Sequence, residues 1–189
     1  MLRAFGRLVL RMMGWRIEGE IPDVPKLVIA VAPHTSNWDF VVGAGAMFAL
    51  DLDLGFLAKH TLFRGPAGPV MRWMGGIAVD RSSAHGVVGD AVAEFARTPR
   101  RLLAIAPQGT RSHGARYRSG FLHIARGAGV PVLLATLDYG ARCVRLGPVL
   151  ETSGDVEADL QRVEAFFANI RGKRPPPAEA VLVPPRTKA

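Results

Sequence analysis

Short apolar runs alternate with segments of helical pattern along almost the whole chain. Apolar runs of this length, bounded by glycine, proline or charged residues, are typical of buried strands. They occur at 27–32, 55–59, 75–81, 102–106, 132–137 and about 142–146. Apolar residues recur at helical spacing in the intervening segments, which are about 40–50, 70–74, 86–97, 119–127 and 156–170. Strands that alternate with helices predict an α/β fold with a mostly parallel central sheet flanked by helices.

A histidine and an aspartate come directly after the first of these runs. His34 stands two residues beyond the predicted strand 27–32, and Asp39 follows five positions later. Open α/β sheets place their sites at the carboxyl ends of strands. A neutral imidazole can accept a proton near pH 7, and a carboxylate on its other nitrogen fixes the tautomer and supports the cation. We therefore expect His34 to be a general base oriented by Asp39; the alternative is that the two residues only cap the turn and the helix.

Polar segments also follow two later strands, and we expect them to share one cleft with His34. Arginine can bind a phosphate with two parallel hydrogen bonds, glycine permits a close approach of the backbone, and threonine supplies a hydroxyl. An isolated arginine is more commonly a solvated surface residue, so the prediction of a shared cleft depends on the combination of these residues with the histidine. The residues concerned are Arg81, Gln108, Gly109, Thr110 and Arg111.

Residues 2–15 predict one helix with a wide apolar arc. Arg3, Arg7 and Arg11 form a narrow basic stripe on it, and Trp15 stands at its end. This pattern is typical of a helix that lies in a membrane interface, although the same helix could pack on the domain with its arginines in solvent. The arginines do not fit a signal peptide, and no apolar run approaches the roughly 20 residues of a membrane span.

The charge balance limits the classes of partner. The net charge is +8, from 24 basic and 16 acidic residues, which suits anionic lipids, phosphorylated ligands or nucleic acid. With only two tyrosines and three tryptophans and no RNA-binding or zinc signature, the sequence does not support a nucleic-acid partner. The single cysteine, Cys143, excludes an internal disulfide and is expected to be a buried thiol in a strand.

Four segments, in order along the chain, resemble the conserved blocks of a known enzyme family. His34 and Asp39 match a His-x-x-x-x-Asp block, and Gly75–Arg81 resembles a Gly-x-Ile-x-x-x-Arg strand. Pro107–Ser112 matches Pro-Glu-Gly-Thr-Arg-Ser except at one position, and Val130–Val132 resembles a Val-Pro-Ile turn. By these blocks the chain is identified as a member of the glycerolipid acyltransferases, of the lysophosphatidic acid acyltransferase type.

This resemblance implies acyl transfer from a thioester to the hydroxyl of a lysophospholipid-like acceptor. The donor would be acyl-coenzyme A or acyl carrier protein, and neither a metal, a cofactor nor a covalent acyl-enzyme would be needed. His34 would deprotonate the acceptor hydroxyl, and Asp39 would hold and polarise His34. Arg81 and Arg111 would bind an acceptor phosphate, Gly109 and Thr110 would shape that site, and Gln108 would also take part in substrate binding. The protein would work peripherally, on the cytoplasmic side of a membrane.

We expect the chain to divide into three parts. Residues 1–20 would form the membrane-interface helix, and residues 21–172 would form the acyltransferase domain. Residues 173–189 contain two proline runs and predict a loose basic tail.

Two positions depart from the family pattern. Pro33 replaces the usual asparagine before the histidine, and Gln108 replaces the usual glutamate. Glutamine keeps the shape and the hydrogen bonding but loses the charge. Because the catalytic pair is unchanged, we expect the His34 chemistry to persist, whereas the acceptor could be a specialised or phosphate-free one. The same pair could instead activate water as a thioesterase, or the chain could be a non-catalytic module that binds lipid or an acyl carrier.

Overall fold

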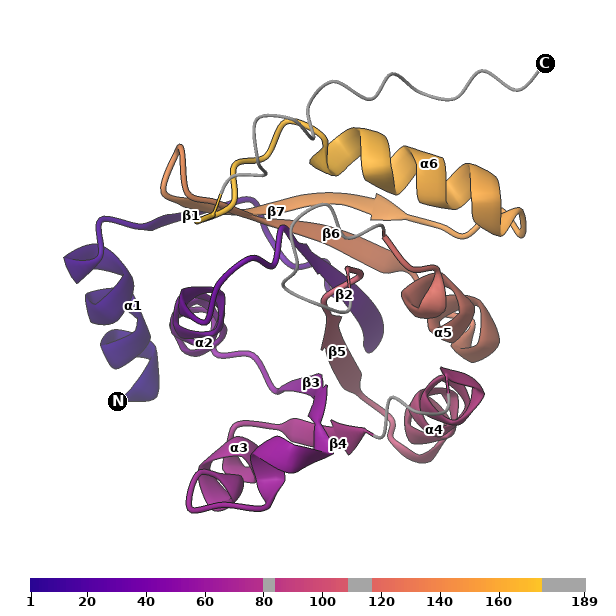
Figure 1. Cartoon of the computed structure of the whole chain (residues 1–189), viewed down its shortest axis with the longest axis horizontal. Helices are drawn as coiled ribbons and strands as arrows, with labels where there is room; N and C mark the ends of the chain where they lie inside the picture. The colour runs from indigo at the N-terminus through magenta and orange to yellow at the C-terminus, as the bar shows by residue number, and fades with distance from the viewer. Residues whose placement is uncertain (80–83, 109–116, 175–189) are drawn as a thin grey trace.

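A central sheet joins distant parts of the chain in the computed structural model, which describes residues 1–79, 84–108 and 117–174. Within these residues the sheet has seven strands in the order β1-β7-β6-β2-β5-β3-β4 (Figure 1). Neighbouring strands are parallel, apart from the antiparallel pair β6 and β7. This confirms the α/β fold with a mostly parallel sheet. The strands are β1 Arg16–Glu18, β2 Lys26–Ala32, β3 Leu54–Lys59, β4 Gly76–Val79, β5 Arg101–Ile105, β6 Val132–Asp138 and β7 Cys143–Leu150.

Helices cover both faces of this sheet. α1 and α2 lie on one face, and α4, α5 and α6 lie on the other (Figure 1). The short helices η1 and α3 connect β3 to β4 at one edge. The helices are α1 Leu2–Met12, α2 Trp38–Ala49, the 3-10 helix η1 His60–Phe63, α3 Gly68–Trp73, α4 Ala84–Arg97, α5 Gly120–Ala128 and α6 Val156–Phe167.

Strand β2 is buried on both sides, which explains its continuous apolar sequence. Val28 and Ala30 face the helices α4, α5 and α6, whereas Leu27 and Ile29 belong to the cluster on the opposite face. A strand covered on both faces needs no alternation of apolar and polar residues. The turn that carries His34 therefore begins at the end of a deeply buried strand.

The N-terminal helix ends earlier than the sequence predicts. Gly14 adopts a left-handed φ of 72°, and the N–H groups of Gly14 and Trp15 donate to the carbonyls of Arg11 and Leu10. This is a Schellman motif, which closes a helix and reverses the chain. The reversal buries Trp15 in the core, so the expectation of a terminal tryptophan at a membrane surface is wrong. Residues 16–18 then form β1, a strand that the sequence analysis missed.

Helix α1 packs closely on α2 and still exposes apolar side chains. A Cβ atom on Gly6 would lie 2.5 Å from the backbone nitrogen of Ala49 and 2.6 Å from the carbonyl oxygen of Gly45. The two helices therefore touch through their backbones, with Leu10 buried beside the crossing. Outside this close contact, α1 exposes Leu2, Phe5, Leu8 and Met12. None of the described helices combines the length and the apolar character that a membrane crossing requires.

Candidate active site

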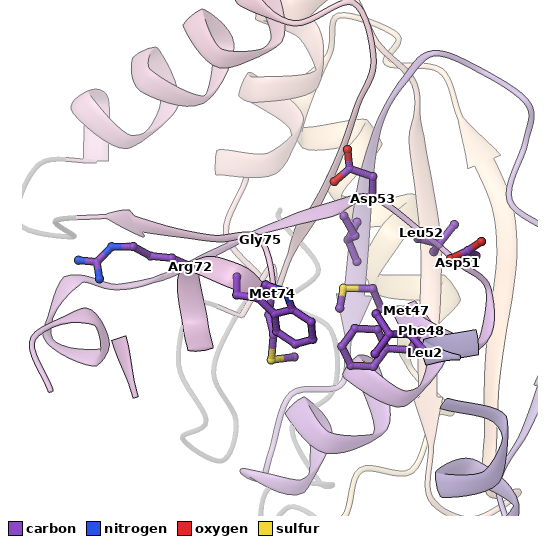
Figure 2. Close-up of a pocket in the computed structure, with 11 residues that line it drawn as sticks. Leu2, Met47, Phe48, Asp51, Leu52, Asp53, Arg72, Met74 and Gly75 are labelled. Carbon is purple, nitrogen blue, oxygen red and sulfur yellow. The ribbon is translucent and has the colours of Figure 1, made fainter. Parts of the chain in front are cut away.

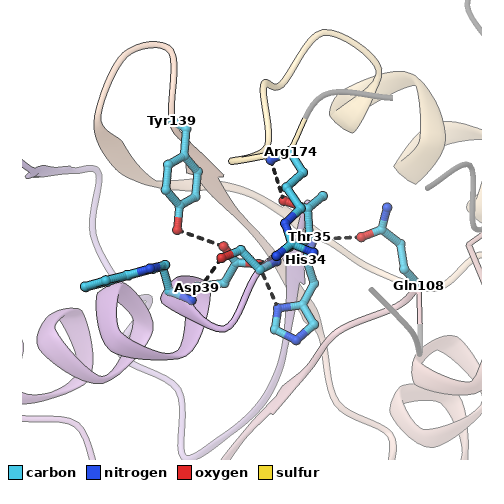
Figure 3. Close-up of polar contacts among 8 residues, drawn as sticks. His34, Thr35, Asp39, Gln108, Tyr139 and Arg174 are labelled. Atoms are coloured by element: carbon cyan, nitrogen blue, oxygen red, sulfur yellow. Dashed lines mark hydrogen bonds and ion pairs between the residues drawn. The ribbon is translucent and has the colours of Figure 1, made fainter. Parts of the chain in front are cut away.

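Three neighbouring parallel strands bring their carboxyl ends together at the site (Figure 3). His34 lies two residues after β2, Gln108 lies three residues after β5, and Tyr139 follows β6 directly. Pro33, which precedes the histidine, has a cis peptide bond with Ala32. The predicted meeting of His34, Asp39 and Gln108 at one edge of the sheet is therefore observed.

His34 and Asp39 face each other within the turn that joins β2 to α2. The Nδ1 atom of His34 lies 3.2 Å from Oδ2 of Asp39. The Asp39 side chain is fully buried, whereas the His34 side chain is 23% exposed. Asp39 also lies in the first turn of α2, where the helix dipole favours a carboxylate. A buried carboxylate thus supports an imidazole that solvent can reach.

Three hydrogen bonds fix the Asp39 carboxylate. Oδ2 accepts from the backbone N–H groups of Thr35 and Ser36, at 2.6 and 2.7 Å. Oδ1 accepts from the hydroxyl of Tyr139 at 2.8 Å. The Ser36 hydroxyl accepts in turn from the N–H of Trp38, at the start of α2. The backbone between His34 and Asp39 therefore curves around the Asp39 carboxylate and donates two hydrogen bonds to it.

These contacts determine the ionisation of the carboxylate. Burial alone would raise the pKa of Asp39, but hydrogen bonds from His34, the Ser36 N–H and Tyr139 outweigh burial and lower this pKa. Burial, followed by the bond to Asp39, raises the pKa of the Tyr139 hydroxyl. Near neutral pH, Asp39 is therefore an anion and Tyr139 remains a protonated donor.

Gln108 supports the backbone of the histidine. Its side-chain oxygen Oε1 accepts a hydrogen bond from the N–H of His34 at 2.7 Å. An amide oxygen and a carboxylate oxygen can both accept this bond, so the replacement of glutamate by glutamine retains it. The side-chain amide then brings an NH₂ group to the site where a glutamate would bring a negative charge.

The remaining predicted binding residues lie outside the described part of the chain. They are Arg81, Gly109, Thr110 and Arg111, and their assignment to the acceptor stays a prediction. Within the described residues, no group of three or more histidine, cysteine, aspartate or glutamate side chains is arranged to hold a metal ion.

Tyr139 is a site residue that the sequence analysis missed. Its ring also packs edge-on against Trp15, with the ring centroids 4.8 Å apart. Tyr139 and Asp39 are 100 positions apart, so no local motif connects them. The available signal was the position of a tyrosine just beyond strand 132–137, at the same sheet edge as His34.

Two hollows border α2, and both are away from the His34 imidazole. A cavity of about 360 Å³ lies at the carboxyl end of the helix, between Leu2, Met47, Asp51 and Trp73 (Figure 2). An open groove of about 240 Å³ lies between α1 and α2. Its walls are apolar and include Phe5, Val9, Phe40, Val41, Ala44 and Phe48.

Comparisons with known proteins agree with the geometry. Residues 17–136, more than half of the chain, match the family model described as Acyltransferase. No curated protein matches the chain. The fold is similar to the crystal structure of the 1-acyl-sn-glycerophosphate (LPA) acyltransferase PlsC from Thermotoga maritima, with a TM-score of 0.57 and 16% sequence identity. That similarity covers 91% of this chain and 80% of the other.

Proposed function

Because the chain belongs to the acyltransferase family, we propose that it moves a fatty acyl group from a thioester to the hydroxyl of a lysophospholipid-like acceptor. The donor would be acyl-coenzyme A or acyl carrier protein. The observation that carries the proposal is the buried, triply hydrogen-bonded carboxylate of Asp39, 3.2 Å from the partly exposed imidazole of His34.

The pair suits direct attack of a hydroxyl on a thioester. With Nδ1 directed to Asp39, Nε2 of His34 takes the proton of the acceptor hydroxyl while the hydroxyl oxygen bonds to the thioester carbonyl carbon. The tetrahedral intermediate then collapses, the carbon–sulfur bond breaks, and the leaving thiolate takes the proton from Nε2. Asp39 stabilises the imidazolium that exists between these steps. The proton of the acceptor hydroxyl ends on the leaving thiol and the acyl group ends on the acceptor oxygen, so no covalent acyl-enzyme is required.

The groove between α1 and α2 suits an acyl chain. It runs along α2 between apolar walls, to which Phe5 and Val9 of α1 contribute. An alkyl chain buried there would gain about 0.8 kcal/mol per methylene group removed from water. On this proposal α1 forms one wall of the acyl site, and the apolar helix α3 lies beyond its far end.

The exposed apolar side chains suggest contact with a lipid surface. On α1 these are Leu2, Phe5, Leu8 and Met12, and on α3 they include Val70 and Trp73. Arg3, Arg7 and Arg11 are exposed elsewhere on α1, where they suit anionic headgroups. We expect a peripheral protein on the cytoplasmic side of a membrane, where a lipid acceptor would be available to the site.

The proposal is tested with long-chain acyl-coenzyme A and acyl carrier protein as donors and a panel of lysolipids as acceptors. The wild type should form a diacyl product, and His34→Ala should reduce the rate about a thousandfold because the general base is lost. His123→Ala, which removes an exposed histidine on α5, is the matched control and should retain full activity.

Two results would contradict acyl transfer. Thioester cleavage that forms no lipid product would indicate a hydrolase that uses the same pair to activate water. Undiminished transfer by His34→Ala, with the variant folded as judged by its melting temperature, would remove the histidine from the mechanism.

A further inference from the structure

The chain beyond α6 returns to the turn that joins β2 to α2, here called the catalytic turn because it carries the proposed catalytic residues His34 and Asp39. Residues 171–174, the C-terminal strap, lie against the turn that holds His34 and Asp39 (Figure 3). The carbonyl of Arg171 accepts from the N–H of Tyr139 at 2.8 Å. Tyr139 thus holds Asp39 with its hydroxyl and the strap with its backbone.

Two residues within the His34–Asp39 interval hold the other end of the strap. The N–H of Arg174 donates to the hydroxyl of Thr35 at 3.3 Å. The Lys173 ammonium lies 4.3 Å from the centroid of the Trp38 ring, within the range of a cation–π contact. A Cβ atom on Gly172 would lie 2.8 Å from the Thr35 side chain, so the strap fits tightly at this point.

The strap brings several positive charges to the edge of the site. Arg171, Lys173 and Arg174 are exposed. Among the described residues, none of the three forms an ion pair with a carboxylate. The nearby Asp39 is buried and already bound by its own donors. The charges of Lys173 and Arg174 are therefore available to an anionic ligand at the catalytic turn.

We propose that Lys173 and Arg174 recognise a phosphate group of a substrate that enters the His34–Asp39 site. Trp38 and Thr35 position the two residues, and their side-chain charges bind the phosphate. The phosphate belongs either to the headgroup of the acceptor or to the coenzyme A part of the donor. The kinetic test of this inference rests on the proposed acyl transfer, whereas the binding test does not.

The test variant combines Lys173→Gln and Arg174→Gln. Both changes remove charge but keep much of the side-chain length, and the backbone N–H of residue 174 remains available to Thr35. The control combines Arg97→Gln and Arg100→Gln, which removes the same charge from exposed positions at the opposite, amino-terminal side of β5. Melting temperatures establish that both variants fold.

Binding is measured by calorimetry with two probes, coenzyme A and a short-chain, soluble lysophosphatidic acid. The test variant should weaken binding of one probe about tenfold, in line with the loss of charge-assisted contacts, and the control should not. The probe that is affected identifies the source of the phosphate. Failure of the wild type to bind either probe, or equal binding by wild type and test variant, would overturn the proposal.

Steady-state kinetics distinguish recognition of a substrate phosphate from a role of the strap in positioning the turn. With a phosphate-bearing substrate the test variant should raise KM about tenfold at unchanged kcat. With its phosphate-free counterpart, a monoacylglycerol or an acyl-N-acetylcysteamine thioester, KM should not change. An equal fall in kcat with both kinds of substrate would overturn phosphate recognition in favour of a strap that only positions the turn. Absence of turnover in the wild type would count against the proposed acyl transfer, while the binding result would still decide on the phosphate site.

Discussion

The two parts of helix α2 are held by different kinds of interaction. At its amino end, directional hydrogen bonds of 2.6 to 2.8 Å fix the Asp39 carboxylate. Along the rest of the helix the contacts are apolar: Gly45 lies against Leu10 of α1, and Phe48 lies 5.9 Å from the ring of Trp73. Hydrogen bonds to a buried charge tolerate little change, whereas apolar surfaces tolerate changes that preserve volume. Substitutions at the amino end should therefore affect the chemical step, and those along the groove should affect the choice of substrate.

Among the residues that support His34, the largest effect is expected from Asp39→Asn. The amide keeps the shape of the carboxylate, but it carries no charge to stabilise the imidazolium of His34. We expect kcat to fall at least about a hundredfold with KM nearly unchanged, as for other losses of general-base support. Steady-state kinetics with the preferred donor and acceptor measure both constants. A loss of less than about threefold would show that the charge of Asp39 is not needed.

The same variant has a stability signature that depends on pH. Because the folded-state pKa of Asp39 is lowered, its contribution to stability is present above the unfolded pKa, about 3.9. That contribution is lost as the pH falls through the lower, folded-state pKa. Asp39→Asn should lack this contribution. The difference in melting temperature between wild type and variant should therefore shrink as the pH is lowered from about 5 to about 2, a range that spans the unfolded-state pKa. A constant difference over this range would contradict the assignment.

Local patterns predicted the pairing of His34 with Asp39, but not the residues that hold Asp39. His34 and Asp39 belong to one short segment after an apolar run, so their proximity follows from the chain itself. Tyr139 contacts Asp39 only because β6 lies next to β2 in the sheet. Strand order is a property of the whole fold, and no spacing within the sequence encodes it. The contact of Lys173 with Trp38 has the same non-local origin.

The fold shows the same division between local and non-local information. The buried run of β2 was predicted almost to its ends, because its apolar sequence suffices to identify it. Strand β1 was missed, because only three residues form it and its pairing with β7 joins Arg16 to Cys143. An ion pair between Glu18 of β1 and Arg145 of β7 joins the two strands, and a single segment cannot reveal it. Cys143 itself is buried and unpaired with another cysteine, as the sequence predicts.

Gln108→Leu tests the polar contacts before the amino end of α2 and should have an intermediate effect. The leucine removes the acceptor for the His34 N–H without altering Asp39, so the histidine loses one of its supports. We expect kcat to fall about tenfold, which corresponds to one lost hydrogen bond at a partly buried donor. Gln108→Glu is the matched control: it retains an acceptor oxygen and should lose less activity than the leucine variant. Equal losses in both variants would assign the role of Gln108 to its NH₂ group instead.

The smallest effect on the chemical step is expected from Ala44→Phe, which fills the groove between α1 and α2. Ala44 is half-buried in the groove wall, so a phenyl ring would shorten the space for an alkyl chain. A large side chain here leaves the hydrogen bonds of Asp39 untouched, and activity with short-chain donors should stay within about twofold of the wild type. Activity with long-chain donors should fall by about tenfold, since several methylene groups would lose their apolar contacts. Ala93→Phe, at an exposed position of α4 on the other face of the sheet, should leave the preference for chain length unchanged. A uniform loss across all chain lengths would place the acyl chain outside this groove and would leave α1 as a packing helix alone.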